Sequence, residues 1–93
     1  MNIDKNTIFC LRDGISVRHD RDDIYYLFDV VNGDVFEINE TTKFIIDKIM
    51  LGKDAEIIFN EICEIDRENN EVTYSDVEYI ISFLLENSLI TKK

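Results

Sequence analysis

The spacing of the apolar residues changes at Ile38, and this change constrains the fold more than any other feature of the chain. Before Ile38, apolar residues alternate with polar ones in segments such as "ISVRHD" and "DVFEI", and this alternation is typical of half-buried β-strands. After Ile38, apolar residues recur every three or four positions, as in an amphipathic helix. The chain is therefore predicted to be an α+β domain with its strands in residues 15–38 and its helices after them.

Three antiparallel strands are expected in the first part. The segment "ISVRHD" gives the first strand, and the charged stretch "HDRDD" is expected to be a loop that leaves His19 at the surface. The segment "IYYLFDVV" suits a central strand because it is rich in aromatic and β-branched residues. Asn32 and Gly33 then favour a type I′ turn, since both tolerate a positive φ. In the third strand, "DVFEI", Phe36 and Ile38 share one face.

Three helices are expected after the sheet. Asn39 is the predicted N-cap of the first helix, and Gly52 is a favourable C-terminal stop. Asp54 can cap the second helix. Ser75 and Glu78 fit a capping box at the start of the third helix.

The whole chain of 93 residues is predicted to be one domain. It divides into an N-terminal extension (1–14), the sheet (15–38) and a helical part (39–90), with Leu89 and Ile90 as a short extended tail. The last two helices would form a helix-turn-helix pair with the hairpin as its wing, so a winged helix-turn-helix architecture is favoured.

The formal net charge of −10 bears on the choice of partner. Neutralising phosphate dominates the affinity of nucleic-acid binding, so neither nucleic acid nor an anionic membrane surface is an expected partner. No apolar run reaches membrane-spanning length, and the N-terminus lacks the features of a secretory signal. A cytoplasmic location is the default expectation.

Residues that could support catalysis or bind a metal are sparse. Cys10 and Cys63 lie far apart and His19 is the only histidine, which excludes the common zinc spacings. There is no phosphate-binding glycine loop, no GxSxG and no HExxH. The chain is therefore read as a non-enzyme, with no catalytic residue, no metal ligand and no cofactor.

Two features point instead to a binding surface. The third strand is an edge in a simple meander, and it lacks the proline and lysine that usually protect edges. Either the negative charges of Asp34 and Glu37 protect it, or the edge is kept open for an incoming peptide strand. The third helix is apolar over more than half of its circumference, because Tyr79, Phe83 and Leu85 lie outside the stripe that fills one face. These residues either pack on the strands or line an exposed apolar groove.

The segment "YYLFDVVNGDVFEINETTKFI" resembles the strand–turn–strand–helix block of PqqD-like proteins, whose pattern is approximately "y.LD...G..y.LN.ta..I". The positions that match it are Leu27, Asp29, Gly33, Phe36, Ile38, Asn39, Thr42 and Ile45. Further matches are Gly52 and, in "SDVEYIISFLLENSLI", residues Asp76, Val77, Ile80, Ile81, Leu84, Leu89 and Ile90. The chain departs from the pattern at Ile38, where leucine is commoner, and at Ser88, where glycine often stands.

The resemblance implies a RiPP recognition element with a winged helix-turn-helix fold. Such modules bind the leader segment of a ribosomally made precursor peptide and present its core to a modifying enzyme, which can be a radical S-adenosylmethionine protein, a cyclase or a leader protease. In the family, the leader adds as a strand to the third strand of the sheet, in the cleft against the third helix.

The candidate peptide site follows from both lines of reasoning. The edge strand would contribute Asp34, Val35, Phe36, Glu37 and Ile38, and the third helix would contribute the i, i+4 ridge of Val77, Ile81 and Leu85. Which flank of the helix faces the groove is not fixed by sequence, so Tyr79 and Phe83 form the alternative ridge. Two other functions stay open: a winged-helix nucleic-acid-binding regulator, and a small structural or interaction subunit.

Overall fold

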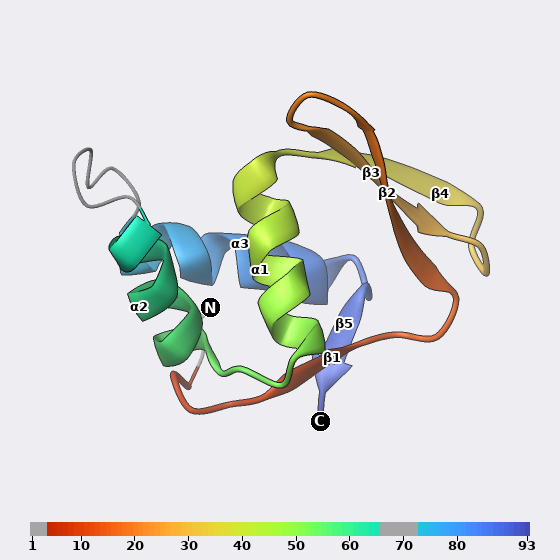
Figure 1. Ribbon diagram of the computed structural model, residues 1–93. Helices are drawn as coiled ribbons and strands as arrows, with labels where there is room; N and C mark the ends of the chain where they lie inside the picture. Colours follow the sequence, from red (N-terminus) through yellow and green to blue (C-terminus); the bar gives the residue numbers. More distant parts are fainter. Residues whose placement is uncertain (1–3, 66–72) are drawn as a thin grey trace.

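The computed structural model describes residues 4–65 and 73–93 (Figure 1). Its elements are β1 (Phe9–Leu11), β2 (Ile15–Arg21), β3 (Ile24–Asp29), β4 (Asp34–Ile38), α1 (Glu40–Met50), α2 (Ala55–Ile65), α3 (Tyr74–Glu86) and β5 (Ile90–Lys92). The expected three antiparallel strands followed by three helices are confirmed, and the chain is an α+β protein. The turn expected between α2 and α3 lies outside the described residues.

The three-stranded sheet has the order β2–β3–β4, with both pairs antiparallel. β2 continues through Arg21, so the loop expected at "HDRDD" is largely strand. His19 is exposed as predicted, and its ring stacks on Tyr25 of β3 at a centroid distance of 4.6 Å. This stacking, together with pairing to β3, explains why the charged segment stays extended.

The hairpin between β3 and β4 was placed correctly, but its predicted turn type is wrong. Asp29 pairs with Asp34, which leaves the four residues 30–33 in the loop. Gly33 has a φ of +76°, whereas Asn32 does not have the positive φ that a type I′ turn requires. The backbone N–H of Gly33 donates to the carbonyl of Asp29 at 2.8 Å. The register is thus fixed by a longer loop than the sequence suggested.

The buried carboxylate of Asp29 holds this loop together. It accepts hydrogen bonds from the backbone N–H of Val31 (3.1 Å) and of Asn32 (3.1 Å), and from the side-chain amide of Asn32 (2.8 Å). These bonds, and the Arg12 guanidinium 3.9 Å away, lower the pKa of Asp29 although burial opposes them. Asp29 therefore sets the end of β3 and the start of β4.

A second, two-stranded sheet was not foreseen. β1 lies within the segment expected to be an N-terminal extension and pairs antiparallel with β5 at the other end of the chain, with Phe9 opposite Lys92. Ser88 takes a φ of +58° before β5, so the turn that glycine often makes in PqqD-like proteins is made here by a serine at a cost of about 1 kcal/mol. β1 and β5 lie below α1 in Figure 1 and close that side of the core.

The first two helices begin where the sequence predicted. The side chain of Asn39 accepts a hydrogen bond from the backbone N–H of Thr42 at 2.8 Å, which makes Asn39 the N-cap of α1. The side chain of Asp54 accepts one from Ile57 at 2.9 Å at the start of α2. Both bonds satisfy N–H groups that have no partner within their helix.

The predicted cap of α3 is two residues too late. The N-cap is Thr73, whose hydroxyl accepts from the backbone N–H of Asp76, while the Asp76 carboxylate accepts from the backbone N–H of Thr73. This reciprocal pair occupies the role assigned to Ser75 and Glu78. Consequently, Ser75 and Glu78 lie within the helix with side chains free to face outward.

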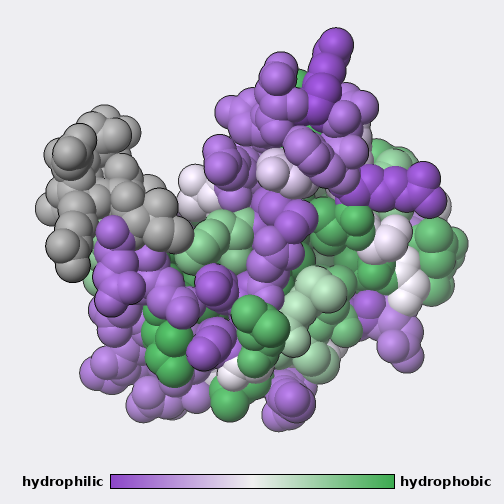
Figure 2. Space-filling model, viewed as in Figure 1, coloured by the Kyte–Doolittle hydropathy of each residue, from purple (hydrophilic) through white to green (hydrophobic). Residues whose placement is uncertain are grey.

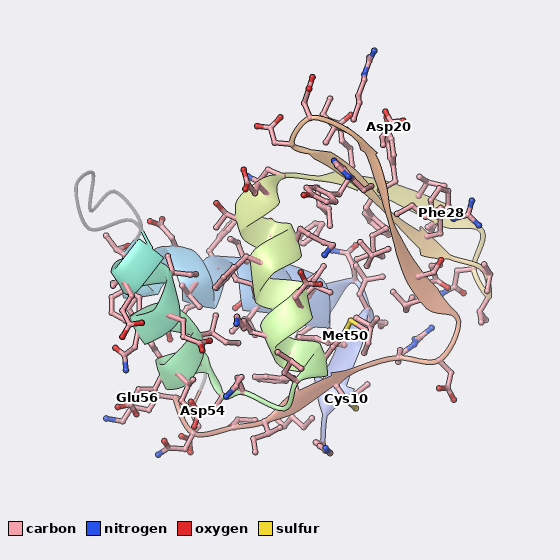
Figure 3. The ribbon with its side chains drawn as sticks, viewed as in Figure 1. Cys10, Asp20, Phe28, Met50, Asp54 and Glu56 are labelled. Carbon is pink, nitrogen blue, oxygen red and sulfur yellow. The ribbon has the colours of Figure 1, made fainter. Side chains whose placement is uncertain are left out.

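One apolar core joins the two sheets and the three helices. Its fully or almost fully buried members are Phe9, Leu27, Ile38, Ile45, Ile46, Ile49, Ala55, Ile58, Ile62, Val77, Ile81, Leu84, Leu89 and Ile90. Exposed apolar residues also occur, among them Val30 and Val31 of the hairpin loop. Figure 2, viewed as Figure 1, shows green hydrophobic surface at the right, on the side where the three-stranded sheet lies. The other face of the three-stranded sheet turns away from the helices and carries Phe28, labelled in Figure 3, with the Arg18 guanidinium 5.6 Å from its ring centre.

Candidate functional site

β4 is an edge strand of the three-stranded sheet. Within the described residues, its strand partner is β3 alone. Side chains alternate along it: Phe36 and Ile38 point toward the core, whereas Val35, which is 56% exposed, and Glu37 point outward. Because a strand directs backbone N–H and C=O groups to both of its edges, the edge of β4 away from β3 presents groups that a further strand can bond.

The ridge of α3 that was predicted to face a peptide lies elsewhere. Val77 and Ile81 are fully buried in the core, and Leu85 is half-buried and packs against it. Their side chains fill the interior, because the stripe they occupy meets the other helices and the sheets. The structure therefore removes Val77 and Ile81 from any surface groove.

The alternative ridge of α3 is the one at the surface beside β4. Tyr79 is 75% exposed, and Phe83, one turn later, is half-buried. The ring of Phe83 meets the ring of Phe36 on β4 edge to face, with centroids 6.0 Å apart. This aromatic pair is worth about 0.5–1.5 kcal/mol beyond its buried area and fixes the distance between β4 and α3.

A shallow depression of about 250 Å³ lies between the end of β4 and α3. It is lined by Glu37, Ile38, Asn39, Thr42, Tyr79, Ile80 and Phe83. We call it the strand-side depression. It borders the C-terminal end of β4 and combines apolar side chains with two neutral polar ones and one carboxylate, so it can receive an apolar side chain from a segment lying along β4.

A second depression of about 360 Å³ lies on the surface of α3 itself. It is lined by Ser75, Glu78, Tyr79, Ser82, Phe83 and Glu86. We call it the helix-side depression. Tyr79 and Phe83 line both the strand-side and the helix-side depression and form the ridge between the two. Sequence reasoning missed Ser82 and Glu86, although they share one face of the helix with Ser75 and Glu78 at spacings of three, four and seven residues.

Other kinds of site find no support in the described part of the chain. Residues 4–65 and 73–93 contain no group of three or more histidine, cysteine or acidic side chains that could hold a metal ion. Cys10 and Cys63 are both free and partly buried, and Figure 3 shows Cys10 on β1 next to β5. None of the described helices is long and apolar enough to cross a membrane.

The similarity of this chain to known proteins lies in its structure rather than in its sequence. No family model and no curated protein matches the chain. A solved structure of lasso peptide synthetase B1 complexed with the leader peptide superposes with a TM-score of 0.71 at 23% identity, covering 89% of this chain and 96% of that one. TbiB1 in complex with the TbiA(beta) leader peptide gives a TM-score of 0.68 at 22% identity, covering 87% and 93%. The chain therefore has the fold of two proteins solved with leader peptides, in agreement with the fold that its resemblance to PqqD-like proteins predicted.

Proposed function

We propose that this protein binds the leader segment of a ribosomally made precursor peptide, which adds as a further strand to the open edge of β4. The observation that carries the proposal is the position of that edge beside the strand-side depression and the exposed Tyr79–Phe83 ridge. Addition of a strand to an edge uses backbone hydrogen bonds for affinity and side-chain pockets for register. Here the edge of β4 offers the backbone groups, and the strand-side depression between β4 and α3 offers the pocket.

The length of β4 sets the size of the bound segment. Five residues at about 3.3 Å each span about 17 Å, so the edge can pair with a peptide stretch of about five or six residues. Side chains of that stretch alternate between two faces. Every second one points toward α3, where the strand-side depression lies, and the others lie next to Val35 and Glu37 on the outer face.

The two proteins of similar fold support this function, because both were solved in complex with a leader peptide. On this proposal the protein is not an enzyme: it holds the leader in the cytoplasm and presents the attached core to a modifying enzyme. A radical S-adenosylmethionine protein, a cyclase or a leader protease would serve as that enzyme. The strand-side depression next to the open edge of β4 supports such a holding role.

Nucleic-acid binding is the less favoured function. In a helix-turn-helix reader the second helix of the pair, here α3, would enter the DNA groove, yet α3 carries three acidic residues and no basic one. The other helix of the pair is acidic too, with Asp54, Glu56, Glu61 and Glu64 on α2 or next to it. The net charge of −10 adds long-range repulsion. A salt-sensitive shift of duplex DNA at micromolar protein would overturn this judgement.

The test is a titration with leader peptides synthesised from short reading frames encoded beside the gene. Fluorescence anisotropy of each labelled leader should show saturable binding to the protein for one of them, at a Kd below about 100 μM. A scrambled version of the same leader serves as the control, because it keeps the composition and the charge but changes the order of the side chains along the strand. Failure of every such leader to bind, or equal binding of the scrambled peptide, would contradict the proposal.

A further inference from the structure

The helix-side depression has a form that follows from the sequence of α3. Ser75 and Ser82 have small side chains, so the helix surface is hollow between the longer side chains around them. Ser82 lies four residues after Glu78 and four residues before Glu86, which places each carboxylate-bearing residue about 6 Å from Ser82 along the helix axis. A group seated over Ser82 would therefore have a carboxylate on either side.

The charge around the two depressions has one sign. Three of the described residues that line them are carboxylates, namely Glu37, Glu78 and Glu86, and none of the lining residues is basic. The ion pairs within residues 4–65 and 73–93 involve other acidic residues. An acidic side chain entering here would be repelled, whereas an ammonium or guanidinium group would be attracted by the carboxylates.

The aromatic ridge between the depressions suits the same kind of group. Tyr79 exposes most of its ring, and a cation placed over the face of an exposed aromatic ring is stabilised. A lysine or arginine can lay its apolar stem across Tyr79 and Phe83 and still keep its charged end beside Glu78 or Glu86. A purely apolar side chain would gain nothing from those carboxylates.

We propose that the peptide bound at β4 carries a lysine or arginine that enters the helix-side depression, while an apolar residue two positions away occupies the strand-side depression. Residues two apart on an extended strand share a face and are about 7 Å apart, which matches two depressions that adjoin along one ridge. This inference rests on the proposed function and deepens it, since it names the chemistry of the recognised peptide.

The test is a selection from a displayed library of random peptides, performed on the parent and on two variants. The first variant is Glu78→Lys with Glu86→Lys, which reverses the charge of the helix-side depression. The matched control is Glu56→Lys with Glu64→Lys, which makes the same change in net charge on exposed residues of α2. Thermal unfolding is measured for all three proteins. If the reversed variant does not fold, Glu78→Gln with Glu86→Gln replaces it.

The parent and the α2 control should select peptides with a lysine or arginine two positions from an apolar residue. The reversed variant should lose this preference, and a synthetic peptide of the selected type should bind it about tenfold more weakly than the parent. This inference is overturned if the parent selects peptides without a basic residue, or if the reversed variant selects the same peptides as the parent. Either result is still compatible with peptide binding at β4. Selection of no peptide at all overturns both.

Discussion

Replacing Tyr79 by alanine should weaken peptide binding about 30-fold with little effect on stability. Tyr79 is 75% exposed, and a fully covered aromatic side chain buries about 200 Å², so about 150 Å² is open to a ligand. A strand lying on β4 that covers half of this area removes about 75 Å² from water. At about 25 cal/mol per Å², the lost burial is about 2 kcal/mol, which corresponds to about 30-fold in Kd.

The stability of Tyr79→Ala should stay within about 0.5 kcal/mol of the parent, because the side chain makes few buried contacts and alanine favours helix. Met50→Ala is the matched control. Met50 is 63% exposed and lies at the C-terminal end of α1, where Figure 3 labels it. At a rise of about 1.5 Å per residue, it is about 15 Å along the helix from Glu40, at the end nearest β4. The substitution Met50→Ala therefore removes a large exposed apolar side chain that lies outside the two depressions.

Both variants are assayed by anisotropy titration with a leader peptide that binds the parent, and by urea denaturation. Tyr79→Ala should bind about 30-fold more weakly, and Met50→Ala should bind like the parent. If Tyr79→Ala binds within twofold of the parent, or if Met50→Ala loses as much affinity, the assignment of the ridge is refuted.

Three further predictions concern the scaffold. Ile81→Ala should lower the free energy of unfolding in urea by about 2–5 kcal/mol, because Ile81 is fully buried; a loss below 1 kcal/mol would contradict its place in the core. Phe9→Ala should cost about 3–5 kcal/mol by the same measurement if β1 closes the core, and an unchanged midpoint would show that β1 is dispensable. The pKa of Asp29 is lowered in the folded protein, so its contribution to stability is complete above its ordinary pKa of 3.8 and is lost as the pH falls through the folded value. Denaturation from pH 7 to pH 2 should therefore show a shallower acid decline for Asp29→Asn than for the parent, and parallel declines would refute this.

Most parts of the fold that depend on neighbouring residues were predictable from sequence, although the type of the β3–β4 turn and the cap of α3 were not. The change of period at Ile38 locates the boundary between sheet and helices, and one side chain suffices to cap α1 at Asn39. The cap of α3 was misplaced because Thr73 and Asp76 fit the same three-residue spacing as Ser75 and Glu78. Local pattern does not distinguish two capping boxes two residues apart.

The parts that depend on distant contacts were not predictable. β1 and β5 are three-residue strands at opposite ends of the chain, and nothing local in either one reveals the other. The orientation of α3 was open for a similar reason: the helix is apolar over much of its circumference, so its pattern does not say which stripe is inside. Packing against α2 and β5 places Val77 and Ile81 in the core and leaves Tyr79 beside β4.

Amide hydrogen exchange, measured by NMR with and without a bound leader peptide, tests the central claim most directly. If the peptide adds as a strand to β4, amides within Asp34–Ile38 that point away from β3 should exchange more slowly in the complex, and signals of Tyr79 and Phe83 should shift. Signals of α2 should stay unchanged. Protection confined to α2, with β4 exchanging at its free rate, would contradict the account.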